Sequence, residues 1–189
     1  EVLVDGVNVK DFKFDTLYDK LGYVTQKAVL FAGSIRENVF FGESAAPESD
    51  EELKNAIGLS QAEEFVDKLP DGAEHMISQM GRNVSGGQKQ RLSIARALSR
   101  KPEILVFDDS FSALDYKTDA KLREGLNEKL KDTTKIIVAQ RISTIRHADK
   151  IIVLDRGEAV GMGTHEELMK NCDVYKEIAL SQLSAAELA

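Results

Sequence analysis

The amino-acid sequence predicts an α/β fold with a mainly parallel sheet and an inserted α-helical subdomain. Residues 104–107, ILVF, are a continuous apolar run, as expected of a central parallel strand that is buried on both faces. Other apolar segments of strand length alternate with segments of helical periodicity, which is typical of a layered fold with a parallel sheet. Residues 44–101 show helical patterns only, so we expect them to form a subdomain between two parts of the sheet.

The remaining elements follow from periodicity and from capping residues. Ser49, Ser85 and Thr164 each precede a Glu or Gln three positions later, a pattern that begins many helices. We expect Gly58 to divide the first of these helical regions, and residues 181–189 to form a fraying tail. The predicted strands cover residues 1–4, 21–25, 104–107, 135–139, 150–154 and 158–162, and the predicted helices cover residues 49–69, 85–101, 116–130 and a final region from 164.

Composition excludes several classes of protein. Lys and Arg total 25 and Asp and Glu total 32, so the formal net charge is −7, which disfavours nucleic acid as the main ligand. The single cysteine, Cys172, cannot form an internal disulfide, and we expect a free thiol. The apolar runs are much too short to span a bilayer, so any membrane segment must come from elsewhere.

The segment Val84–Gln88, VSGGQ, is the strongest chemical signal. It places a hydroxyl and two glycines at a predicted helix start, where unpaired backbone N–H groups and the helix dipole favour an anion. Glycines also allow a phosphate to approach the backbone closely. The alternative is that Ser85 is only a cap and that Gly86 and Gly87 are only a loop.

Two acids follow the buried strand directly. An acid at the carboxyl end of a parallel strand is well placed to hold Mg²⁺ through waters, and Asp108 has this position. Asp109 would then be poised to activate water. The alternative is that both acids are a solvated strand end.

These segments together resemble the nucleotide-binding domain of ABC transporters over nearly all of the 189 residues. The resemblance implies a core like that of P-loop NTPases, ATP and Mg²⁺ as cofactors, and ATP hydrolysis as the activity. Val84–Gln88 resembles the signature motif, residues 104–108 the Walker B strand, residues 112–115 the D-loop, Gln26 the Q-loop glutamine that joins the metal site to the helical subdomain, and residues 30–39 the stretch where the coupling helices of exporters dock.

The resemblance implies one partial domain over residues 1–189. Its RecA-like core would comprise residues 1–43 and 102–180, its helical subdomain residues 44–101, and its tail residues 181–189. No GxxxxGK[ST] phosphate loop is present, although the family has one before the position of Glu1. We therefore expect a fragment of a longer polypeptide, rather than a natural remnant, and weak nucleotide binding and hydrolysis by the chain alone.

Two further departures concern the hydrolytic residues. Asp109 stands where the family has its catalytic glutamate, and displacing a base by about 1 Å can cost on the order of 10²-fold in rate. Gln140 stands where the family has its switch histidine, and an amide can donate a hydrogen bond but cannot change protonation. The alternative is that Asp109 works nearly as well through backbone adjustment.

This combination resembles the degenerate-site subunit of heterodimeric bacterial multidrug-type exporters. It implies a second, different nucleotide-binding domain as partner, and transmembrane domains that dock on residues 28–42 and on the helical subdomain at the cytoplasmic face of the plasma membrane. Asp109, Gln140 and Gln26 would be the catalytic residues of the chain's own site, and Asp108 with Gln26 its metal site. The residues expected to act in the partner's site are Val84, Ser85, Gly86, Gly87, Gln88 and Asp115.

Three alternatives remain open from the sequence. They are a fully active ATPase domain of a homodimeric exporter, a soluble ABC ATPase acting on DNA or ribosomes, and a non-hydrolysing interaction module. We expect His75, His147 and His165 to be solvated surface residues, and Arg91 and Arg96 to make structural contacts of their helix. Phe31, Phe40 and Phe41 are equally consistent with core residues and with an aromatic interface to a membrane domain.

Overall fold

The computed structural model describes residues 1–42 and 46–183. It divides into two compact units, Glu1–Val138 and Ala139–Ala189. Most of the predicted tail, residues 184–189, lies outside the described residues, as does the predicted subdomain boundary between residues 43 and 44.

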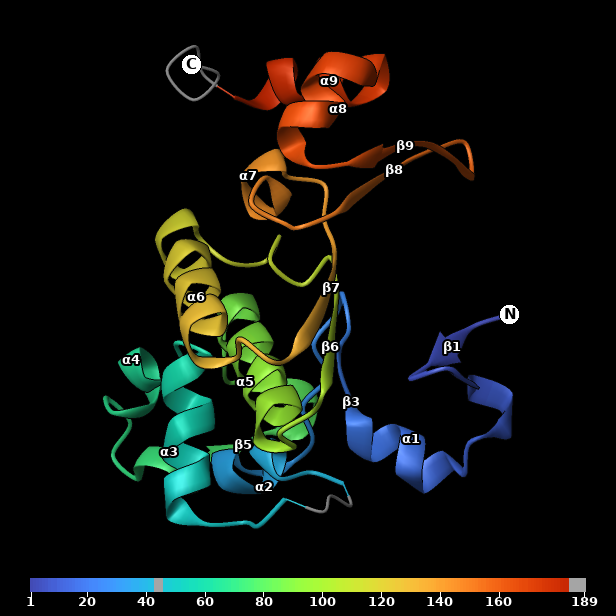
Figure 1. Ribbon diagram of the computed structural model, residues 1–189. Helices are drawn as coiled ribbons and strands as arrows, with labels where there is room; N and C mark the ends of the chain where they lie inside the picture. The colour runs from blue at the N-terminus through green and yellow to red at the C-terminus, as the bar shows by residue number, and fades with distance from the viewer. Residues whose placement is uncertain (43–45, 184–189) are drawn as a thin grey trace. The chain divides into compact units, whose positions relative to one another are not determined.

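The first unit contains the predicted α/β core (Figure 1). Its strands are β1 (Leu3–Val4), β2 (Val7–Asn8), β3 (Leu21–Val24), β4 (Gly33–Ser34), β5 (Met76–Ile77), β6 (Ile104–Asp108) and β7 (Thr134–Val138). Its α-helices are α1 (Phe14–Lys20), α2 (Ile35–Val39), α3 (Asp50–Leu59), α4 (Glu63–Val66), α5 (Gly86–Ser99) and α6 (Tyr116–Lys129), with 3₁₀ turns at Val9–Asp11, Gly72–Glu74 and Gln79–Gly81.

A three-stranded parallel sheet forms the centre of this unit, in the order β3-β6-β7. The central strand β6 is the predicted apolar run, and Leu105 and Phe107 are fully buried. The parallel core within an α/β fold is thus confirmed. The other strand pairs, β1 with β2 and β4 with β5, are antiparallel and only two residues long each.

The two faces of the parallel sheet differ in how they are covered. Helices α5 and α6 lie over one face (Figure 1), and Leu92 and Leu122 from these helices share a core cluster with Phe107. The opposite face exposes Tyr23 and Ile136, which both pair in register with Val106, at 55% and 51% of their surface. Because parallel sheets are normally covered on both faces, this exposed apolar face is unusual.

Helix α5 packs tightly against strand β3 through a glycine. A Cβ at Gly22 would lie 2.8 Å from side-chain atoms of Leu105 and Pro102 and 3.0 Å from the carbonyl oxygen of Ala97 on α5. Only a residue without a side chain allows the helix backbone this close to the strand.

The helical region differs from the prediction in two details. Gly58 does not divide the helix: α3 continues to Leu59, and the break falls at Gln61, which has a left-handed backbone with φ of 60°. Residues 44–101 also include strand β5, which pairs with β4. The predicted cap is confirmed, because the Ser49 side chain accepts a hydrogen bond from the backbone N–H of Glu52.

The second unit is a β-hairpin packed against helices (Figure 1). Ile151 and Val153 are buried in a cluster with Leu168 and Tyr175, and the predicted capping box at Thr164 is confirmed. Cys172 is buried and has a free thiol. The elements are α7 (Ile142–Ile145), β8 (Ile151–Asp155), β9 (Glu158–Gly163), α8 (His165–Asn171) and α9 (Asp173–Gln182). Across the described residues of both units, every helix is too short or too polar to cross a membrane.

The contact at Gly22 predicts opposite effects for two glycine-to-alanine substitutions. Gly22→Ala should lower the free energy of unfolding by about 1–3 kcal/mol, because the added methyl overlaps strand and helix atoms. Gly58→Ala should raise the free energy of unfolding by about 0.5–1 kcal/mol. Gly58 is helical, and the nearest atom to a Cβ added there would be 3.9 Å away, so the alanine fits without a clash. Urea unfolding followed by circular dichroism measures both, and equal effects would contradict the packing described.

Candidate nucleotide site

The two acids lie at the carboxyl end of β6, as predicted. Asp108 is the last residue of the strand and pairs in register with Val138 of β7. The next residue, Asp109, still donates its backbone N–H to the Val138 carbonyl at 2.9 Å, but its φ is +46°. Asp is one of the few residue types that tolerate this left-handed conformation well, so the short acid suits the turn that follows β6.

Asp108 accepts a hydrogen bond that the sequence did not reveal. The Tyr23 hydroxyl on β3 donates to Asp108 Oδ2 at 2.9 Å. This hydrogen bond to the carboxylate is the main reason that the pKa of Tyr23 is raised above its ordinary value. Tyr23 therefore holds one oxygen of the acid on the exposed side of the sheet.

Gln26 and Asp109 are brought together across neighbouring strands. Gln26 follows β3 by two residues, and β3 pairs in parallel with β6, so both side chains lie at the same sheet edge. The Gln26 Nε2 group donates to Asp109 Oδ2 at 3.3 Å. The Q-loop glutamine and the predicted catalytic acid thus belong to one cluster.

The signature segment forms the start of α5. Ser85 Oγ accepts from the backbone N–H of Gln88 at 3.3 Å, and the Gln88 side chain accepts from the backbone N–H of Ser85 at 2.8 Å. The predicted capping box is therefore present. A Cβ at Gly86 would meet no atom of the described residues within 4 Å, so this helix terminus is open to a ligand.

The D-loop lies beside the signature glycines. A Cβ at Gly87 would lie 3.4 Å from the carbonyl oxygen of Ala113. Asp115 caps α6 and accepts from the backbone N–H of Thr118 at 3.0 Å and from its hydroxyl at 2.7 Å. The backbone hydrogen bond, followed by the hydroxyl, lowers the pKa of the Asp115 carboxyl below its ordinary value. Asp115 therefore stays ionised at physiological pH.

Gln140 lies near the start of the second unit and contacts the end of helix α9. Its backbone carbonyl accepts from Gln182 Nε2 at 2.8 Å, and Gln182 Oε1 accepts from the backbone N–H of Ile142 at 2.9 Å. The segment that follows β7 is thereby tied to the end of α9.

Metal ligation at this edge of the sheet depends on oxygen atoms. The described residues contain no group of three or more His, Cys, Asp or Glu side chains that could hold an ion without help. Asp108, Asp109 and the amide oxygen of Gln26 nevertheless fit Mg²⁺, which is commonly bound by one or two carboxylates, waters and substrate phosphates.

Two polar residues near the site escaped the sequence analysis. Tyr23 alternates with buried Val24 on β3, which marks it as a residue of the opposite sheet face. Gln90 is 1% exposed and lies on the same buried stripe of α5 as Ile94 and Ala97. A polar residue within an apolar helical stripe is a usable signal, because buried polar groups require partners.

The predicted docking stretch contains an aromatic cluster around Arg96. The Phe31 and Phe41 rings stack with centroids 4.1 Å apart, and the Arg96 guanidinium carbon lies 5.5 and 5.4 Å from them. Arg96 also donates to the backbone carbonyl oxygens of Asn38 and Val29 at 2.7 and 3.0 Å. Burial lowers the pKa of Arg96.

The three phenylalanines of this stretch differ in their exposure. Phe31 and Phe41 are 42% and 49% exposed, whereas Phe40 packs against the core. The predicted structural contacts of Arg96 are confirmed, and so are those of Arg91, which donates to the Gln61 carbonyl at 2.9 Å.

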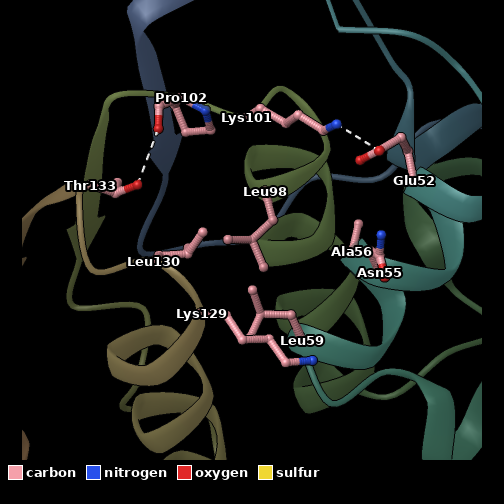
Figure 2. A pocket seen from close by; sticks show the side chains of 10 residues that line it. All are labelled: Glu52, Asn55, Ala56, Leu59, Leu98, Lys101, Pro102, Lys129, Leu130 and Thr133. Carbon is pink, nitrogen blue, oxygen red and sulfur yellow. Dashed lines mark hydrogen bonds and ion pairs between the residues drawn. The ribbon is translucent and has the colours of Figure 1, made fainter.

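A cavity of about 450 Å³ lies between α3, the end of α5 and the end of α6 (Figure 2). Leu59, Leu98 and Leu130 point into it, and an ion pair of 2.6 Å between Lys101 and Glu52 lies at one side. None of the predicted site residues lines this cavity, so it is separate from the acids and from the signature segment.

Comparison with known proteins identifies the family. The sequence family described as ABC transporter matches residues 1–112, more than half of the chain. The chain belongs to the ABC transporter family. A solved bacterial Atm1-family ABC exporter with ATP bound matches this ABC domain at a TM-score of 0.88 with 34% identity, over 95% of the domain and 31% of the exporter chain.

The curated relatives include a protein named for multidrug export. A putative ABC transporter ATP-binding protein of Mycoplasma genitalium is 43% identical over 96% of this chain. A putative multidrug export ATP-binding/permease protein of Staphylococcus aureus is 41% identical over 94% of it. The chain spans 30% of the length of each of these two relatives. The ABC ATPase fold and the relation to ABC exporters are therefore confirmed.

The Tyr23–Asp108 hydrogen bond predicts a shift in titration. In Asp108→Asn, the pKa of Tyr23 should fall toward that of a free tyrosine, because the carboxylate that disfavours the tyrosinate is gone. Asp109→Asn is the matched control and should leave the Tyr23 pKa unchanged, because Asp109 pairs with Gln26. NMR titration of the Tyr23 ring carbon tests this, and identical curves for the two variants would contradict it.

Proposed function

We propose that this domain binds MgATP and couples its turnover to export by transmembrane domains at the cytoplasmic face of the plasma membrane. The observation that supports this most directly is the assembled edge of the β3-β6-β7 sheet. There, Gln26 meets Asp109 beside the Walker B acid Asp108, and the signature helix terminus lies beside the D-loop. We assign the first pair of contacts to the chain's own nucleotide site and the second to a site shared with a partner domain.

The exposed face of the parallel sheet suits a covering layer, and we propose that this layer contains the phosphate loop. Tyr23, Ile136 and Val138 are each more than half exposed on one face of a parallel sheet, where a covering layer is the rule. We propose that a segment of the full-length protein with the glycine cradle and lysine packs on this face. The side of Asp108 that contacts Tyr23 would then face the nucleotide.

Mg²⁺ would be held by Asp108 and Gln26, with waters and phosphate oxygens completing its shell. When bound, the ion neutralises charge that develops on the phosphates during hydrolysis. The domain's own residues would have three roles next to the ion. Asp108 would fix the position of Mg²⁺, Gln26 would orient a water, and Asp109 would accept a proton from that water.

We propose that the chain's own site hydrolyses ATP slowly. Asp109 is one methylene shorter than the family's glutamate, and Gln26 already holds one of its oxygens at 3.3 Å. Its backbone N–H donates to the Val138 carbonyl at 2.9 Å, so a backbone shift that lengthens the reach of the carboxylate would have to break this bond. Gln140, in place of the switch histidine, can donate to a phosphate but supplies no charge.

The signature segment would instead serve the site of a partner domain, which we propose is a different subunit. The amino terminus of α5 is open at Gly86, its Ser85 hydroxyl proton can point outward, and the carbonyl of Ala113, two residues before Asp115, lies beside Gly87. In the sandwich arrangement that the family resemblance implies, these groups would face the nucleotide held by the partner's phosphate loop. The residues proposed for this contact are Val84, Ser85, Gly86, Gly87, Gln88 and Asp115.

Residues 28–42 and the helical subdomain would contact the transmembrane domains. The stacked Phe31 and Phe41 rings are half-exposed and fixed by Arg96, which gives a rigid aromatic surface suited to an inserted coupling helix. The net charge of −7 gives no support to a nucleic-acid partner.

A homodimeric, fully active ATPase is the second candidate. The observation in its favour is that Asp109 retains a carboxylate directly after β6, next to Asp108, where a base is expected. The two candidates differ in what a single subunit can do without a different partner.

Lengthening the acid should separate these candidates. In the full-length protein assembled without another subunit type, Asp109→Glu should raise kcat for ATP hydrolysis by roughly tenfold or more, because it restores the reach of the base. Asp109→Asn is the control and should lower the remaining rate. Steady-state phosphate release measures both. Fast turnover of the unmodified protein, with no gain in Asp109→Glu, would show that the degenerate-site proposal is wrong.

A further inference from the structure

Gln90 makes a buried hydrogen bond that connects the signature helix to the Q-loop. Its side chain is in the second turn of α5, five residues after Ser85, and it is 1% exposed. Its Nε2 group donates to the backbone carbonyl of Thr25 at 3.1 Å. Thr25 immediately precedes Gln26, whose own side chain donates to Asp109.

A second contact fixes the helix on the same strand. The Ala97 carbonyl of α5 lies 3.0 Å from the position of a Cβ on Gly22 of β3. Seven residues separate Gln90 from Ala97 along the helix, and three separate Gly22 from Thr25 along the strand, so both intervals span about 10 Å. The distance between the two contacts is therefore the same along the helix as along the strand. Helix α5 runs antiparallel to β3 and contacts it at both ends of this interval.

We propose that Gln90 is a positioning residue that makes the placement of Gln26 depend on the orientation of the signature helix. This inference rests on the proposed function and deepens it by naming the connection between two nucleotide sites. The amino terminus of α5 would contact nucleotide bound by the partner, and Gln90 transmits a shift of that helix to Thr25 and so to Gln26. Gln26 then moves relative to Asp109 in the chain's own site.

Other side chains of α5 contact different parts of the first unit from Gln90. Arg91 points to the helical subdomain and contacts the Gln61 carbonyl, and Arg96 points to the Phe31 and Phe41 cluster. Gln90 contacts the residue directly before Gln26, whereas Arg96 reaches the same loop four residues further on, at the Val29 carbonyl. A helix held to three regions moves as a unit, and physical contact networks of this kind can transmit coupling between sites.

A double-mutant cycle tests the proposal. Gln90→Met keeps length and helix propensity but removes the donor, and Gln26→Ala removes the group on which Gln90 is proposed to act. Gln61→Met is the matched control, because Gln61 Nε2 also donates to a backbone carbonyl, that of Gly58 at 3.2 Å, but within the helical subdomain. The full-length protein in its native assembly is used, and kcat and KM for ATP are measured separately.

Gln90→Met should lower kcat about fivefold to tenfold with KM changed less than about twofold. In the Gln26→Ala background the same substitution should have almost no further effect, whereas Gln61→Met should change kcat little in either background. Equal effects of Gln90→Met in both backgrounds would overturn the proposal and leave only a structural hydrogen bond.

Hydrogen exchange keeps the inference testable if the assembly proves not to hydrolyse ATP, an outcome that would reject the proposed function alone. Gln90→Met should increase amide exchange in residues 23–28 severalfold, and Gln61→Met should not. Unchanged exchange in this segment in Gln90→Met would overturn the proposed connection independently of any ATPase activity.

Discussion

The close packing of helix α5 on strand β3 is the constraint on which the site depends. Gly22 leaves no room for a side chain between the strand and the helix, so the spacing of the two elements is fixed by backbone contact. The strand ends two residues before Gln26, and the helix begins directly after Ser85. This packing therefore holds the strand that precedes Gln26 against the helix that begins after Ser85, the two segments to which we assign tasks in nucleotide binding.

The same geometry supports the proposal that the domain hydrolyses slowly in its own site and contributes its signature segment to another. The acids at the end of β6 are held from three sides, by Tyr23 on Asp108, by Gln26 on Asp109 and by the backbone of β7. The signature terminus has no such constraint at Gly86, and its open N–H groups point away from the helix body. An acid that is short and already paired is a poor base, whereas an exposed helix terminus is a ready phosphate ligand.

Much of this could be predicted from the sequence, because strong local signals specify it. The run 104–107, the capping box at Ser85 and the acids after β6 all appear where periodicity and capping rules place them. The predicted helix break at Gly58 was wrong, because a glycine near the end of a helix lowers helix stability only slightly. The chain leaves the helical conformation at Gln61, which has a left-handed backbone. Strand β5 was missed because two residues give no periodicity. Tyr23 and Gln90 required the tertiary structure, since their partners are 85 and 65 residues away along the chain.

Comparing two substitutions in the same assembly tests the central claim most directly. In the full-length protein assembled with the proposed second subunit, Ser85→Arg should reduce ATP hydrolysis by more than about tenfold, because the helix terminus that it blocks is proposed to face the partner's nucleotide. Asp109→Asn in the same chain should change the rate less than about twofold, because we propose that most turnover occurs in the partner's site. A large loss in Asp109→Asn with little effect of Ser85→Arg would contradict the account.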